Sequence, residues 1–296
     1  MHLGLIVFEF TDRMRKTLDR ILTAVLIVVT IAMAIPLLWY GGRAFVADRF
    51  VTRGESMYPT FHTGQAVYVN KLLMGARIYT DFDFDTPELH CFRMPGIRKL
   101  RRGDIAIFNY PYGTDGKRLG FKINYVYCKR CIGTPGDTVE IADGFYVDAK
   151  DRRPIPTGIP LGNILKMRAT PDSVLLKNRC LEAGAFAGED WTIKDFGPIT
   201  VPSKGLTIKL DSLNLKHYAR AMEWEKNRGA YAGEDSMDPL HDDWGLPGGE
   251  YTFRENWYFF AGDNVSDSRD SRYLGFVPED FVIGIVKVND KRYDDR

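Results

Sequence analysis

NYVYCKRCI, residues 124–132, is rich in β-branched and aromatic side chains, and the turn sequence TPGD follows at residues 134–137. A run of this composition bounded by a turn predicts a β-strand. On a strand the side chains alternate between two faces, one carrying Tyr127, Lys129 and Cys131 and the other Cys128, Arg130 and Ile132. Because the surroundings are largely apolar, the lysine and the arginine cannot both lie at an exposed sheet surface. We expect one of them to point inward.

A lysine that points inward has an unusual chemistry. Burial disfavours the ammonium form and therefore lowers the pKa of the side chain. The spacing alone equally allows Lys129 to snorkel at a sheet edge, with its stem buried and its charge in water.

Further short strands are expected on both sides of this segment. They alternate in polarity or are apolar, and turn signals separate them: residues 65–70, 103–109, 138–141, 257–261 and 281–288. Segments with helical periodicity are few, and residues 212–228 are the best candidate. The sequence therefore predicts a mainly β protein with minor α content.

Composition divides this β protein into parts. Residues 150–255 are rich in Asp, Gly, Pro and Trp and carry no chemical motif, so we interpret them as an inserted non-catalytic subdomain. Residues 43–149 and 256–296 would then form the β core. Within it, residues 73–102 are expected to form an extended hairpin or flap.

Residues 21–40 read ILTAVLIVVTIAMAIPLLWY and carry no charge. A helix of this length spans about 30 Å, the thickness of a bilayer's hydrocarbon core. A cleaved signal peptide is the alternative, but the apolar run continues beyond the small residues Ala32 and Ala34 that would mark its cleavage site. We expect a retained transmembrane anchor at residues 21–42. Basic residues flank it on both sides, so charge alone does not determine the orientation; we favour residues 1–20 in the cytoplasm and the rest of the chain outside.

Composition also excludes several classes of function. Forty Lys and Arg against 39 Asp and Glu give a net charge of +1, so nothing indicates nucleic-acid binding. Four cysteines are too few for a disulfide scaffold, and whether any of Cys91, Cys128, Cys131 and Cys180 pair stays open. The histidines form no HExxH motif and no glycine-rich phosphate loop is present, so we expect neither a metal nor a cofactor.

Two loops carry residue types that packing alone does not explain. In RGESMYPT, residues 53–60, a serine stands between Gly54 and Pro59, which by itself is an ordinary turn. GDNVSDSRDSR, residues 262–272, is dense in small polar side chains. A calcium loop is disfavoured there, because Val265 takes a ligand position and no Glu closes a twelve-residue loop. A hydrogen-bonded network of Ser, Asp and Arg fits better.

Taken together, these segments resemble the type I signal peptidase (leader peptidase) family. The matching boxes, in order and after an N-terminal anchor, are Gly54-x-Ser56-Met57-x-Pro59-Thr60, Arg102-Gly103-Asp104-Ile105, Tyr127-x-Lys129-Arg130-x-x-Gly133-x-Pro135-Gly136-Asp137, and Gly262-Asp263-Asn264 through Ser268-x-Asp270-Ser271-Arg272-x-x-Gly275-x-Val277. The resemblance implies an antiparallel β catalytic core. It also implies a membrane-anchored serine endopeptidase that removes N-terminal signal peptides from exported preproteins after small-x-small sites.

The resemblance implies roles for individual residues. Ser56 would be the nucleophile and Lys129 the general base, which requires a neutral amine. A free lysine is protonated at pH 7, so its pKa must fall by about 2–3 units, equivalent to roughly 3–4 kcal/mol. Ser268 would hydrogen-bond and orient the lysine, and Asp270 with Arg272 would form a supporting ion pair.

Other roles depend on residues near these boxes. Some family members carry a serine where this chain has Gly54, and its hydroxyl helps to bind the oxyanion; here a backbone amide or a water would do so. Arg130 would be a structural partner. The candidates for shallow pockets that admit small side chains are Thr52, Phe61, Tyr127 and Cys128.

The substrate would lie as an extended segment along an exposed strand edge near Ser56. Phe61 and Tyr58 are further expected to dip into the bilayer surface. The expected partners are exported preproteins and the lipid bilayer, and the expected location is the bacterial inner membrane, single-pass, with the catalytic part outside. A maturation protease with a dedicated substrate and a non-catalytic anchored assembly factor are the alternatives. Oligomeric state and substrate range stay open.

Overall fold

The structure, a computed structural model, describes residues 2–81, 89–112, 119–186, 189–227 and 249–287, with the backbone alone for residues 2–12. The chain forms two compact units, Met1–Val46 and Ala47–Arg296. Residue 228, the expected end of a helix, and residue 288, the expected end of a strand, lie outside the described residues.

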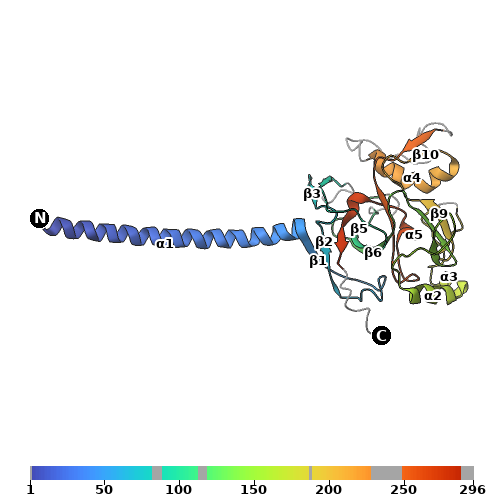
Figure 1. Ribbon diagram of the computed structural model, residues 1–296, viewed down its shortest axis with the longest axis horizontal. Coiled ribbons are helices and arrows are strands. Elements are labelled where there is room, and N and C mark those ends of the chain that lie inside the picture. Colours follow the sequence, from blue (N-terminus) through green and yellow to red (C-terminus); the bar gives the residue numbers. More distant parts are fainter. Residues whose placement is uncertain (1, 82–88, 113–118, 187–188, 228–248, 288–296) are drawn as a thin grey trace. The chain divides into compact units, whose positions relative to one another are not determined.

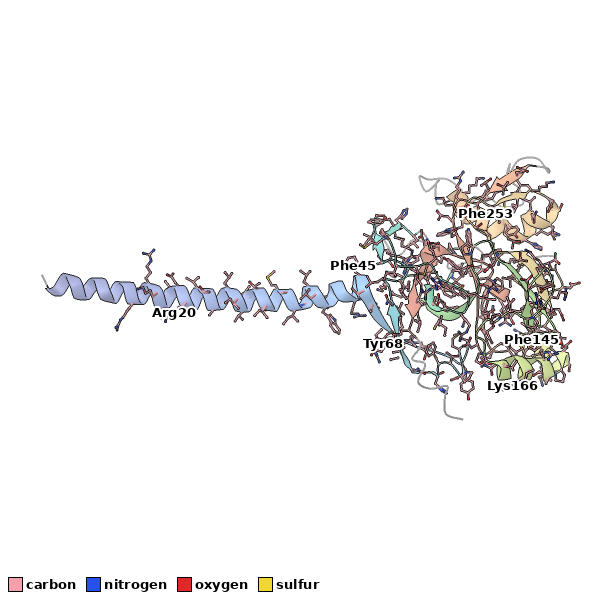
Figure 2. The ribbon with its side chains drawn as sticks, viewed as in Figure 1. Arg20, Phe45, Tyr68, Phe145, Lys166 and Phe253 are labelled. Atoms are coloured by element: carbon pink, nitrogen blue, oxygen red, sulfur yellow. The ribbon has the colours of Figure 1, made fainter. Side chains whose placement is uncertain are left out.

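The first unit is a single long helix. Helix α1 runs from His2 to Gly41, and a short π-helical turn, Gly42–Val46, follows it (Figure 1). Its apolar side chains are exposed all along the uncharged run (Figure 2), as an isolated membrane span requires. Within the described residues it is the one helix long and apolar enough to cross a membrane. The predicted apolar N-terminal helix is confirmed, and it begins well before residue 21.

The second unit is built on a seven-stranded sheet of order β1-β2-β14-β5-β6-β12-β13. All the pairings described between these neighbours are antiparallel. Its strands are β1 (Ala47–Val51), β2 (Ala66–Asn70), β5 (Ile105–Asn109), β6 (Val126–Gly133), β12 (Trp257–Ala261), β13 (Val277–Pro278) and β14 (Val282–Val286).

Smaller sheets and short helices complete this unit. Strands β7 (Thr138–Ala142), β8 (Phe145–Val147) and β9 (Phe196–Thr200) form a three-stranded sheet, and two hairpins pair β3 (Arg77–Tyr79) with β4 (Cys91–Arg93) and β10 (Thr207–Lys209) with β11 (Glu250–Thr252). The helices are α2 (Leu161–Ala169), α3 (Asp172–Lys177), α4 (Ser212–Asn227), α5 (Ser271–Leu274) and a 3-10 turn, Glu279–Phe281. The predicted fold class, mainly antiparallel β with few helices, is confirmed.

Strands β5 and β6 lie in the interior of the sheet; β5 is buried throughout, and β6 is buried on both faces from Lys129 onward. On β5, Ile105 and Ile107 pack into a cluster with Met57, whereas Phe108 packs into the larger core on the other face. This explains why β5 reads as a nearly continuous apolar run. Strand β6 lies between β5 and β12, with Lys129 opposite Ala106. A lysine in the middle of this strand therefore enters the protein interior.

The segment of residues 150–255 contributes a strand to a sheet whose other strands lie outside it. Its strand β9 pairs with β7, which lies outside that segment, and the pairing joins Ile199 to Val139. Residues 47–296 form one compact unit. The division into a catalytic core and an inserted subdomain stays a prediction. In the segment 73–102 the expected hairpin is that of β3 and β4.

Candidate active site

Ser56 lies in the loop between β1 and β2, residues 52–65, which we call the serine loop. Thr52 closes its base, since its backbone N–H donates to Gln65 O at 2.9 Å and its Oγ1 to the same oxygen at 3.1 Å. Met57 is buried in the core and anchors the loop from below. Gly54 has φ = +76°, a conformation that glycine adopts without steric cost. The loop thus holds Ser56 in a half-buried position.

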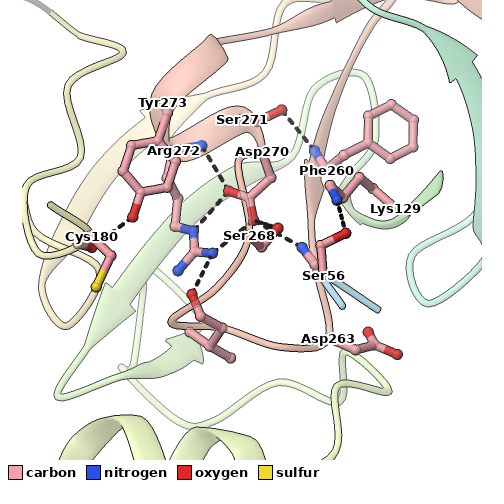
Figure 3. Close-up of polar contacts among 12 residues, drawn as sticks. Ser56, Lys129, Cys180, Phe260, Asp263, Ser268, Asp270, Ser271, Arg272 and Tyr273 are labelled. Atoms are coloured by element: carbon pink, nitrogen blue, oxygen red, sulfur yellow. Dashed lines mark hydrogen bonds and ion pairs between the residues drawn. The ribbon is translucent and has the colours of Figure 1, made fainter. Parts of the chain in front are cut away.

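Lys129 reaches the serine from β6. Its side chain is 4% exposed, and Nζ donates a hydrogen bond to Ser56 Oγ (Figure 3). The Tyr127 ring centroid is 5.2 Å from Nζ. Burial lowers the pKa of Lys129, and the nearby Asp270 carboxylate only partly opposes this effect. Among the ion pairs of the described residues, none includes Lys129. The geometry therefore favours a neutral amine beside a hydroxyl.

Asp270 and Arg272 form an ion pair beside this contact, both with side chains that are 0% exposed. Arg272 Nε donates to Asp270 Oδ1 at 2.8 Å and Nη2 to Oδ2 at 2.7 Å. Asp270 Oδ2 also accepts from the backbone N–H of Gly262 at 2.9 Å and from Ser268 Oγ at 2.7 Å. Although burial raises it, the Arg272 guanidinium brings the pKa of Asp270 below its ordinary value. The carboxylate therefore stays charged and fixes the backbone of the 262–272 loop.

Asp263 joins this loop to the strand of Lys129 and to the serine loop. Its carboxylate is 0% exposed and accepts from Arg130 Nε at 2.7 Å and Nη2 at 2.6 Å. Thr60 Oγ1 donates to the same carboxylate. Asn264 N donates to Ser56 O at 3.0 Å. Sequence reasoning gave Asp263 and Thr60 no role, although both stand inside the quoted boxes.

Comparison with known proteins assigns the chain to a family. The family described as "Signal peptidase, peptidase S26" matches residues 19–179 and 196–289. The chain belongs to this signal peptidase family.

Individual members are distant in sequence. Signal peptidase I of Pseudomonas aeruginosa is 27% identical over 252 residues, which cover 82% of this chain and 64% of that protein. Signal peptidase I S of Bacillus subtilis is 30% identical over 190 residues, 64% of this chain and 71% of that protein. The chain thus spans less than two thirds of the Pseudomonas relative. A solved signal peptidase I from Enterococcus faecalis shares 23% identity with a TM-score of 0.30, covering 64% of this chain and 97% of its own.

The predicted membership of the signal peptidase family is confirmed. In its third box, the expectation that one of the two basic residues points inward is met by both, because Lys129 and Arg130 are 4% and 9% exposed. Alternation places them on opposite faces of β6, and both faces are covered from Lys129 onward. Arg130 is compensated in the interior by Asp263.

Ser268 also differs from the expectation for a signal peptidase. Its hydroxyl donates a hydrogen bond to Asp270, whereas Lys129 donates to Ser56. Among the hydrogen bonds of the described residues, none joins Ser268 to Lys129. Gly262 makes this packing possible, because a Cβ there would lie 2.2 Å from Ser268 Oγ.

The four residues expected to line substrate pockets lie near the serine loop and β6. Tyr127 is half-buried and packs against Tyr110 and Tyr125, with ring centroids 5.1 and 5.6 Å away. The backbone N–H and the hydroxyl of Thr52 both donate to Gln65 O and close the serine loop. Burial raises the pKa of Cys128 to about 12, so its sulfur stays a thiol. None of the four cysteines, all of which the structure describes, forms a disulfide bond.

The expectation that Phe61 dips into the bilayer was wrong. Its side chain is 5% exposed and packs into the cluster that contains Met57 and Val69. Tyr58, by contrast, is 43% exposed. The described residues contain no group of three or more His, Cys, Asp or Glu that could hold a metal ion. The expected absence of a metal or cofactor stays a prediction.

Proposed function

We propose that the chain is a membrane-anchored serine endopeptidase that removes N-terminal signal peptides from exported preproteins. The observation that carries this proposal is the contact between the buried Lys129 Nζ and Ser56 Oγ. A hydroxyl is a weak nucleophile unless a base takes its proton, and a lysine with a lowered pKa can act as that base. Cleavage of a preprotein by the full chain, and its loss in Ser56→Ala, tests the proposal.

The reaction proceeds in two steps. Neutral Lys129 takes the proton of Ser56 as Oγ attacks the carbonyl carbon of the scissile bond, and the resulting ammonium gives this proton to the leaving amine. Lys129 then takes a proton from a water that hydrolyses the ester at Ser56, which releases the signal peptide. A backbone amide such as that of Ser56 stabilises the oxyanion, because position 54 is glycine and supplies no hydroxyl.

The remaining polar residues keep this pair in place. Asp270 and Arg272 fix the 262–272 loop, and Ser268 of the same loop donates its hydroxyl to Asp270. The catalytic core comprises residues 43–149 and 256–296, and residues 150–255 are an inserted subdomain. Helix α1 anchors the chain in the bacterial inner membrane, with the catalytic part on the outer side. Among the described residues, α1 is the one helix long and apolar enough to cross a membrane, which supports its role as the anchor.

The rate of cleavage is expected to rise with pH. Below its pKa, Lys129 is an ammonium and has no lone pair to accept the proton, so kcat/KM increases as pH rises and levels off above that pKa. Because burial lowers the pKa, the half-maximal rate is reached below the value of about 10.4 typical of a free lysine. The measurement is kcat/KM from neutral to alkaline pH, with a substrate that lacks titratable groups near the cleavage site. A profile that is flat or falls would contradict a neutral lysine base.

Cleavage is also expected to require small substrate side chains. Enlarging the residue directly before the scissile bond from Ala to Leu should lower kcat/KM at least about 10-fold, because a shallow pocket rejects the added bulk. The matched control enlarges the residue between the two small positions, which should be tolerated. Undiminished turnover of the first substrate would refute the pocket prediction and leave the Ser56–Lys129 proposal standing.

A further inference from the structure

Asn163 links the segment of residues 150–255 to the two loops beside Ser56, the serine loop and the 262–272 loop. It is the third residue of α2, and its Nδ2 donates to Tyr58 O at 2.7 Å and to Asp263 O at 2.8 Å. Tyr58 stands two residues after Ser56 in the serine loop. Asp263 precedes Asn264, whose N–H holds Ser56 O at 3.0 Å. One amide group therefore joins the two loops beside their direct hydrogen bond.

The chemistry of this contact requires a side chain that donates hydrogen bonds. Both partners are backbone carbonyls, which only accept hydrogen bonds, so the amide nitrogen must face them. A carboxylate would place negative oxygen against two carbonyl oxygens, and an alanine would leave both carbonyls without this donor. An aspartate at position 163 is therefore expected to push the loops apart, whereas an alanine would only release them.

Helix α2 is a fixed support for this amide. Its Ile164 and Met167 are buried in the main core. Arg168, near its other end, pairs with Asp143 in the turn between β7 and β8 and lies over the Phe145 ring at 4.7 Å. Because both ends of the helix are tied to the rest of the unit, the position of Asn163 is set by the fold and not by the loops that it bridges.

We propose that Asn163 is a positioning residue, which holds the serine loop against the 262–272 loop so that Ser56 stays within reach of Lys129. This inference rests on the proposed function of the Ser56–Lys129 pair. The segment expected to be non-catalytic then contributes to turnover without contacting the reacting atoms. A displacement of about 1 Å at a reacting atom can cost roughly 100-fold in rate, so two loop contacts can have a large effect on kcat.

The test compares full-length Asn163→Ala and Asn163→Asp with Asn214→Ala. Asn214 is a matched control, because it is also a half-buried third residue of a helix, α4, and its Nδ2 donates to a backbone carbonyl, Lys209 O, at 2.9 Å. We expect kcat on a preprotein to fall about 10-fold in Asn163→Ala and about 100-fold in Asn163→Asp. KM should stay within about twofold of the parent value. The pH at half-maximal kcat/KM should stay within a few tenths of a pH unit of that of the parent.

Thermal unfolding separates this effect from a general loss of stability. The assays are made well below the unfolding midpoint of every variant, and Asn214→Ala should keep the parent kcat. A kcat of Asn163→Ala equal to that of Asn214→Ala, or a loss confined to KM, would overturn the inference, and this comparison holds even where Asn163→Asp fails to fold. Parent activity that disappears in Ser56→Ala shows that the proposed function stands in either case. Activity that persists in Ser56→Ala would instead remove the proposed function itself.

Discussion

Ser56→Ala and Lys129→Ala, made separately in the full chain, are each expected to lower kcat/KM on a preprotein at least about 1,000-fold. The first substitution removes the oxygen that attacks the carbonyl. The second removes the nitrogen that contacts this oxygen and takes its proton. Because the two residues act as one unit, the double variant should be no slower than the slower single variant. The measurement is the appearance of mature protein with time, at a fixed ratio of enzyme to substrate.

Conservative variants distinguish a neutral base from a cationic group. Lys129→Arg keeps a positive charge but supplies no lone pair at any accessible pH, so it is expected to be as inactive as the alanine variant. Lys129→Met keeps the length of the apolar stem and should preserve the fold, because the position is buried. Lys194→Met is the control: this lysine binds Asp172 at 2.7 Å, and its loss should leave the rate unchanged. Activity in Lys129→Arg would exclude proton transfer to residue 129.

The strands that carry the site could be predicted because their composition is local information. The β-branched and aromatic run around Lys129 predicted β6, and the helical periodicity from residue 212 predicted α4, whose described bounds are Ser212–Asn227. The register that places Lys129 opposite Ala106 could not be predicted in the same way. It depends on which strands become neighbours, and residue spacing within one strand does not determine that.

The misplaced residues share one physical cause. Sequence alternation predicts two faces of a strand but not what covers them, so the burial of Arg130 depended on Asp263, a residue 133 positions away. Phe61 was expected at the bilayer surface as an apolar residue near Ser56, yet its ring packs into the core beneath the serine loop. Asn163 gave no signal at all, since a single asparagine at the start of a helix belongs to no motif. Its importance is visible only when the two carbonyls that it bridges are seen together.

Arg272→Met is expected to lower the free energy of unfolding by about 3–5 kcal/mol, the usual cost of removing one partner of a buried ion pair. Asp270 is 0% exposed and would lose two of its hydrogen bonds, those from Arg272 Nε and Nη2. The donors that remain, the backbone N–H groups of Gly262 and residue 272 and the hydroxyl of Ser268, are neutral and leave the buried carboxylate without a compensating charge. The measurement is urea unfolding of the full chain in detergent, followed by tryptophan fluorescence.

Arg153→Met is a matched control, because Arg153 also pairs with an aspartate two residues earlier, Asp151, but at an exposed site where the side chains are 83% and 41% accessible. We expect no measurable change in stability there, since water screens such a pair. The double variant Asp270→Leu with Arg272→Met should be more stable than the sum of the two single losses predicts, because it leaves no unpaired charge in the interior. Equal effects at positions 272 and 153 would show that the buried pair contributes little.

The sign of the pH dependence of stability gives an independent check. With the pKa of Asp270 lowered in the fold, the stability due to this carboxylate is present above the unfolded value of about 3.9 and is lost as pH falls through the folded value. Removing Arg272 removes the charge that lowers this pKa, so the acid-induced loss of stability due to this carboxylate should be smaller in Arg272→Met than in the parent chain.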